Sequence, residues 1–66
     1  MNILLNGQPH EVPENTTIAG MLALLGLDSK PVVVELNELA MLPRDYSNSQ
    51  LNEGAKVELV VMAAGG

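Results

Sequence analysis

The chain of 66 residues contains no cysteine, tryptophan or phenylalanine, and Tyr46 is its single aromatic residue. Without cysteine, neither a disulfide framework nor a thiolate metal site can contribute to stability. Because hydrophobic residues still make up 47% of the chain, the core must be aliphatic and contain Leu, Val, Ile and Met. A chain this short buries only about 60% of its unfolded surface, so we expect one small domain without a deep catalytic cleft.

Positive charge is also scarce, since three Lys and Arg residues stand against eight Asp and Glu residues and give a net charge of −5. A phosphate backbone would repel such a chain, which argues against nucleic acid as a partner. An acidic domain is better suited to a basic protein surface, where opposite potentials speed encounter. A charged surface that only keeps the protein in solution is the alternative.

Long apolar runs are absent as well. The first residues lack a cationic segment followed by an apolar stretch, and no segment approaches the ~20 apolar residues of a membrane span. We therefore expect a cytoplasmic protein that does not bind membranes. His10 is the single histidine, and without cysteine or a fixed carboxylate nearby it predicts a loop residue and no metal site.

The first half of the chain predicts a β-hairpin and a helix. Short strands near residues 3–5 and 11–12 flank Asn6 and Gly7, a pair that tolerates the positive φ angles of a tight turn. Thr16 or Thr17 can cap a helix that ends at Gly26. Its apolar positions recur at helical spacing: Ile18, Met21, Leu22 and Leu25. Gly20 inside this helix suggests close approach to a strand, and loose packing that tolerates a glycine is the alternative.

The second half predicts three strands, at residues 32–36, 39–42 and 57–62. Pro43 ends the middle one, and the polar segment that follows it allows at most one helical turn. The last strand alternates, with Val57, Leu59 and Val61 on one face and Glu58, Val60 and Met62 on the other. This order predicts an α+β fold, a mixed sheet of four to five strands with one main helix on one face.

The predicted domain covers residues 1–62, and a flexible tail of two alanines and two glycines, Ala63 to Gly66, follows it. A terminal Gly-Gly arises by chance in roughly 0.5% of chains at average glycine usage. Four residues reach at most about 14 Å, and glycines without Cβ can pass through a channel too narrow for side chains. The tail can therefore carry an ionised carboxylate into the active site of another protein.

Several motifs occur together and in order along the chain. They are Asn6-Gly7, Thr17-Ile18, Leu36-Asn37, Pro43-Arg44, Glu53-Gly54, the strand that begins at Val57, and the terminal Gly65-Gly66. Over essentially its whole length the chain thus resembles the sulfur carrier protein of thiamin (thiazole) biosynthesis, of the ubiquitin-like β-grasp family. It departs from that pattern at Asn37-Glu38, where a turn glycine is common, and at Ala55, where an acidic residue is usual.

The resemblance implies a carrier without catalytic activity or bound cofactor. An E1-like adenylating enzyme with Mg-ATP would adenylate the Gly66 carboxylate. A cysteine desulfurase or sulfurtransferase would supply sulfur, and thiazole synthase would use the resulting thiocarboxylate. Gly65, Ala64 and Ala63 would lie in the partner's channel, and Met62 with Val60 would form an apolar docking patch. Simple sheet packing is the alternative for those last two side chains.

Two other functions remain open. A related β-grasp carrier, such as the small subunit of molybdopterin synthase, or a ubiquitin-like modifier joined to lysines would share the fold and the tail. An acidic protein-interaction module without carrier chemistry would share only the charge, and its terminal glycines would have no role.

Overall fold

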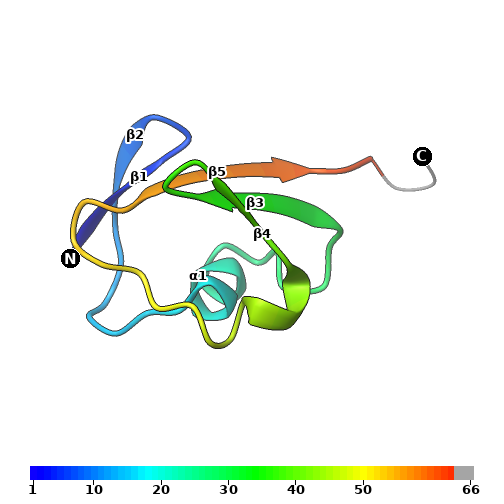
Figure 1. Cartoon of the computed structure of the whole chain (residues 1–66), viewed down its shortest axis with the longest axis horizontal. Coiled ribbons are helices and arrows are strands. Elements are labelled where there is room, and N and C mark those ends of the chain that lie inside the picture. The colour runs from blue at the N-terminus through cyan, green and yellow to red at the C-terminus, as the bar shows by residue number, and fades with distance from the viewer. Residues whose placement is uncertain (64–66) are drawn as a thin grey trace.

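The computed structural model describes residues 1–63, and within them five strands form one mixed sheet with a single α-helix against one face (Figure 1). The strand order is β2-β1-β5-β3-β4, with β5 parallel to β1 and antiparallel to β3. The elements are β1 (Asn2–Leu5), β2 (Gln8–Glu11), α1 (Ile18–Leu24), β3 (Val32–Leu36), β4 (Leu39–Met41), the 3-10 turn η1 (Pro43–Asp45) and β5 (Lys56–Val61). The predicted fold class is confirmed.

Both hairpins turn on two residues with positive φ, the geometry that matches the twist of the flanking strands. Asn6 and Gly7 have φ of 50° and 80°, as the sequence predicts. Asn37 and Glu38 have φ of 50° and 71° although neither is glycine, and the Lys56 backbone N–H donates to Asn37 Oδ1 at 2.9 Å. This hydrogen bond offsets part of the cost of a left-handed backbone without glycine.

The second strand lies earlier than residues 11–12, because β2 pairs Gln8 with Leu5 immediately after the turn. It contains Pro9, which cannot donate a ladder hydrogen bond but is tolerated because β2 is an edge strand. His10 therefore lies in a strand and is half-buried, and its prediction as a loop residue is wrong.

The helix is fixed at both ends by the residues that the sequence indicates. Thr17 Oγ1 accepts the Gly20 backbone N–H at 3.0 Å. Gly26 has φ of +73°, and the backbone N–H groups of Gly26 and Leu27 donate to the carbonyls of Ala23 and Leu22. These paired hydrogen bonds are the Schellman end of a helix. Gly20 faces no strand, since a Cβ there would meet only the side chains of Thr17 and Thr16.

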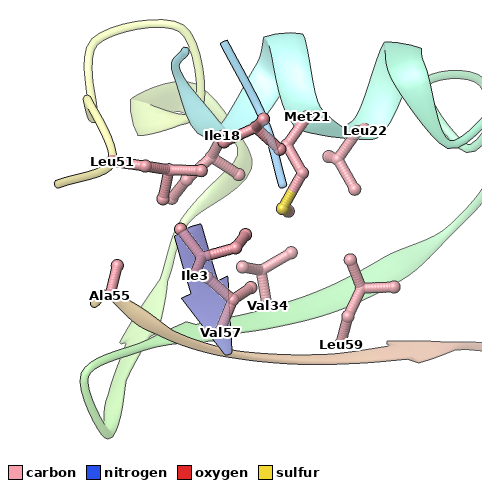
Figure 2. Packing of buried hydrophobic residues seen from close by; sticks show 10 residues of the cluster. Ile3, Ile18, Met21, Leu22, Val34, Leu51, Ala55, Val57 and Leu59 are labelled. Carbon is pink, nitrogen blue, oxygen red and sulfur yellow. The ribbon is translucent and has the colours of Figure 1, made fainter. Parts of the chain in front are cut away.

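The core lies between α1 and the facing side of the sheet, as Figure 2 shows. Its buried hydrophobic side chains are Ile3, Val12, Ile18, Met21, Leu22, Val34, Leu51, Ala55, Val57 and Leu59. Ala55 belongs to this set, so a charged residue at that position would be buried without a partner here. The core is aliphatic, as the absence of Phe and Trp requires.

The tail begins where β5 ends. Val61 closes the strand, and the Met62 N–H donates to the Pro31 carbonyl at 2.9 Å. Ala63 is exposed and lies outside any element. The predicted flexibility of the tail concerns Ala64, Gly65 and Gly66, which lie outside the described residues.

Candidate functional site

The strand that leads to the tail is the central strand of the sheet. Neighbours on both sides hold β5 at its beginning, where Val57 pairs with Leu5 of β1 and with Leu36 of β3. Val57 is fully buried, whereas Val61 is 46% exposed. The strand thus starts in the core and emerges from it toward Ala63, so the position of Ala63 is set by a strand that is anchored in the core.

Asn6 holds this strand through its side chain as well as its backbone. The Asn6 backbone N–H donates to the Val57 carbonyl at 2.8 Å. Its Oδ1 accepts the Leu59 N–H at 2.7 Å, and its Nδ2 donates to the Leu59 carbonyl at 3.1 Å. The side-chain amide therefore takes the place of a peptide group and extends the parallel β1–β5 ladder by one pair.

The sequence identifies Asn6 as a turn residue and gives no sign of this second role. Asn is common in such turns because it tolerates positive φ, and that reason alone is sufficient to explain it. The contact to Leu59 joins residues 53 positions apart. It depends on the parallel pairing of β1 with β5, which no local pattern specifies.

Val60 and Met62, the predicted docking patch, are both exposed, at 61% and 48%. Val60 pairs with Val33 on the face of the sheet away from α1, and Val33 is 46% exposed. Val60 thus packs beside Val33 in the sheet and is still largely exposed, so the docking patch and simple sheet packing both stay predictions for it. Met62 also borders a groove of about 540 Å³ beside the helix, together with Leu22, Leu27, Val32 and Tyr46.

Acidic groups lie next to the Val33–Val60 pair. Glu35 and Glu58 are directly opposite each other on β3 and β5, an arrangement that destabilises a sheet because like charges repel. Lys56 offsets part of this, with Nζ 4.0 Å from Glu58 and 3.5 Å from Glu38. The outer face of the sheet therefore presents an apolar pair beside an acidic pair, which suits a basic and partly apolar protein surface.

In residues 1–63, neither a group of metal ligands nor a membrane-spanning helix is found. Within that range no group of three or more His, Cys, Asp or Glu side chains could hold a metal ion. In the same part of the chain, no helix has both the length and the apolar character needed to cross a bilayer.

Comparison with known proteins decides the family. A sequence model of the ThiS family matches residues 3–66, nearly the whole chain. The chain belongs to the ThiS family. The crystal structure of the thiamine biosynthesis protein ThiS from Geobacter metallireducens superimposes with a TM-score of 0.84 at 28% identity, over 100% of both chains. This ThiS-family chain therefore has the β-grasp fold that the sequence predicts.

Related sequences include a protein of similar length and two much longer proteins. The sulfur carrier protein ThiS of Thermus thermophilus is 36% identical over 64 residues, which cover 97% of this chain and 98% of that protein. Two proteins named thiazole synthase, from Paramagnetospirillum magneticum and Magnetococcus marinus, are 34% and 36% identical over the full length of this chain. This ThiS-family chain spans only 20% of the length of each of those two proteins.

Proposed function

We propose that this protein is a sulfur carrier for thiamin thiazole synthesis and that the Gly66 carboxylate is its reactive group. The observation that carries the proposal is the central strand β5, which leaves the core and ends beside an exposed Ala63. Membership of the ThiS family and the similarity to the Thermus thermophilus sulfur carrier support it. Gly65, Ala64 and Ala63 then serve as the narrow connection between domain and carboxylate.

The chemistry begins with an unreactive group, because an ionised carboxylate is a poor electrophile. A carboxylate oxygen of Gly66 attacks the α-phosphorus of Mg-ATP in the E1-like adenylating enzyme, and pyrophosphate leaves. The terminal persulfide sulfur of a cysteine desulfurase or sulfurtransferase then attacks the acyl carbon, and AMP leaves. A second thiol cleaves the resulting acyl disulfide and releases the thiocarboxylate, whose sulfur thiazole synthase transfers as the carboxylate is restored.

In this scheme the carrier is a cosubstrate and its partners supply all catalysis. Its own contribution is recognition, for which the Val33–Val60 pair supplies apolar area and the Glu35–Glu58 pair supplies charge. The two thiazole synthases that contain a stretch similar to this whole chain support a direct contact with that enzyme. Domains joined in one polypeptide meet at high effective concentration.

The test is an intact-mass measurement after incubation with Mg-ATP, the adenylating enzyme and a sulfur donor. We expect one oxygen of the carrier to be replaced by sulfur, and reactions that lack ATP or the donor to show no such replacement. A variant with one alanine added after Gly66 should remain unmodified. An unchanged mass in the complete reaction would refute the sulfur-carrier proposal, and an adduct on a lysine of another protein would point to a ubiquitin-like modifier instead.

A further inference from the structure

The backbone groups of β5 point alternately to its two sides, and two hydrogen bonds identify which residues face β3. The Met62 N–H donates to the Pro31 carbonyl, and the Lys56 carbonyl accepts the Asn37 N–H. Because the direction alternates along a strand, residues 56, 58, 60 and 62 direct their N–H and C=O groups toward β3. Residues 57, 59 and 61 direct theirs toward β1.

The backbone groups that face β1 have hydrogen-bond partners at two of these three residues. Val57 is bonded by the Asn6 backbone, and Leu59 is bonded at both N–H and C=O by the Asn6 side chain. Val61 is the next residue in this series, and within residues 1–63 nothing bonds to its N–H or C=O. Figure 1 shows β5 running on past the turn of the β1–β2 hairpin. The last part of the central strand is therefore an open edge.

Natural proteins protect exposed strand edges with lysine, proline, a bulge or a covering loop, because free edges invite pairing with other chains. This edge has none of the protective residue types, since Val60, Val61 and Met62 are all apolar. All three side chains are also exposed. An incoming strand would therefore find two free backbone groups with apolar side chains beside them, the arrangement that strand addition uses.

We propose that an extended segment of the thiazole synthase adds to this edge and exchanges backbone hydrogen bonds with Val61. The occupant rests on the proposed function, which makes that enzyme a partner of the carrier. Val61 and Ala63 are two positions apart, so in an extended chain their backbone groups point to the same side. Pairing at Val61 would therefore continue along the direction of β5 toward Ala63. The new strand would therefore set the direction in which the tail enters the enzyme, while the outer face supplies charge and apolar area.

The first test measures hydrogen exchange of single backbone amides in the ¹⁵N-labelled full chain. Exchange is compared between the free chain and its complex with purified thiazole synthase. We expect the Val61 amide to exchange rapidly in the free carrier and at least tenfold more slowly in the complex. The Val60 amide, which faces β3, serves as the internal reference because it is protected in both states. A Val61 amide that exchanges equally fast in a complex that forms would overturn the proposal.

The second test separates backbone from side chain with two substitutions at one position. Val61→Pro removes an N–H that the fold does not use, so the domain should keep its thermal midpoint, and affinity for thiazole synthase should fall at least tenfold. Val61→Ala retains the N–H and should lower affinity by no more than about threefold. Equal affinity of Val61→Pro and the wild-type chain, or an equal loss in both variants, contradicts pairing through the backbone.

The mass measurement described above keeps the two proposals apart. If the thiocarboxylate forms but the wild-type carrier does not bind thiazole synthase, the strand-addition proposal is wrong and the sulfur-carrier proposal stands. If no thiocarboxylate forms but the Val61 amide is still protected in the complex, the edge is a real interface and the proposed chemistry is wrong.

Discussion

Replacing Asn6 should weaken the domain more than replacing an ordinary turn residue, because its side chain makes two hydrogen bonds to Leu59. Each bond contributes about 0.5–1.5 kcal/mol net, so their joint loss costs roughly 1–3 kcal/mol. Asn6 also has φ of 50°, and a side chain such as Ala pays about 1–2 kcal/mol more in that conformation. Asn6→Ala should therefore lose about 2–5 kcal/mol.

That loss is large compared with the free energy of unfolding expected for a chain of 66 residues, which is roughly 3–10 kcal/mol. Equilibrium urea unfolding measures it, with the midpoint and slope compared between variants. Asn6→Gly is the matched control, because it tolerates the positive φ and removes only the side chain. It should lose less than Asn6→Ala but still at least about 1 kcal/mol. A stability of Asn6→Gly equal to that of the wild-type chain would refute the role assigned to the side chain.

Asn6→Asp should make the stability of the domain depend on pH in a way that the wild-type chain does not. The ionised carboxylate can accept the Leu59 N–H but places an oxygen against the Leu59 carbonyl, whereas the protonated form can donate to it. The folded state should thus favour the protonated form and raise the pKa of this carboxyl above its unfolded value. The stabilisation from the protonated carboxyl is fully present at pH values below the unfolded pKa, and it is lost as the pH rises through the folded pKa. The stability deficit relative to wild type should accordingly shrink on acidification, and a deficit that is constant with pH would contradict this geometry.

Three further predictions concern the core, the helix end and the outer face. Met21→Ala should cost about 2–5 kcal/mol in urea unfolding, because Met21 is fully buried against the sheet; a loss below 1 kcal/mol would mean that the site collapses around the smaller residue. Gly26→Ala should cost about 1 kcal/mol in the same assay, since Gly26 has φ of +73°. Glu58→Gln should leave the domain at least as stable by removing repulsion from Glu35. It should also slow association with thiazole synthase in stopped-flow experiments at low salt, and an unchanged rate would exclude this pair from the interface.

Local chemistry predicts much of this fold, and its failures have a common cause. The Asn6-Gly7 turn, the Thr17 cap and the Gly26 end depend on a few adjacent residues, so the sequence places them correctly. The position of β2 depends on the length of the turn, which the run of apolar residues does not reveal. The Asn37-Glu38 turn adopts positive φ without glycine because Asn37 also bonds to distant Lys56.

The sequence predicts some features of the candidate site and misses others for the same reason. Val60 and Met62 are both exposed, but Val60 lies on the face away from α1 whereas Met62 borders the groove beside the helix, so the patch stays a prediction. The contact of Asn6 with Leu59 and the unpaired edge at Val61 could not be predicted, because both depend on which strand lies beside β5 and on where that strand ends. The assignments of Ala64, Gly65 and Gly66 stay predictions that the carrier chemistry must test.

The central place of β5 also has a mechanical consequence. A pull on the tail loads the hydrogen bonds to β1 and β3 in shear, along the strand direction, so that many bonds must fail together. A tail attached to an edge strand would load the hydrogen bonds to one neighbouring strand alone. We expect forced-unfolding measurements with the load applied between Met1 and Ala63 to give a high rupture force, lowered by Asn6→Gly. An enzyme that draws the tail into its channel and later releases it can then do so without extracting the strand from the domain.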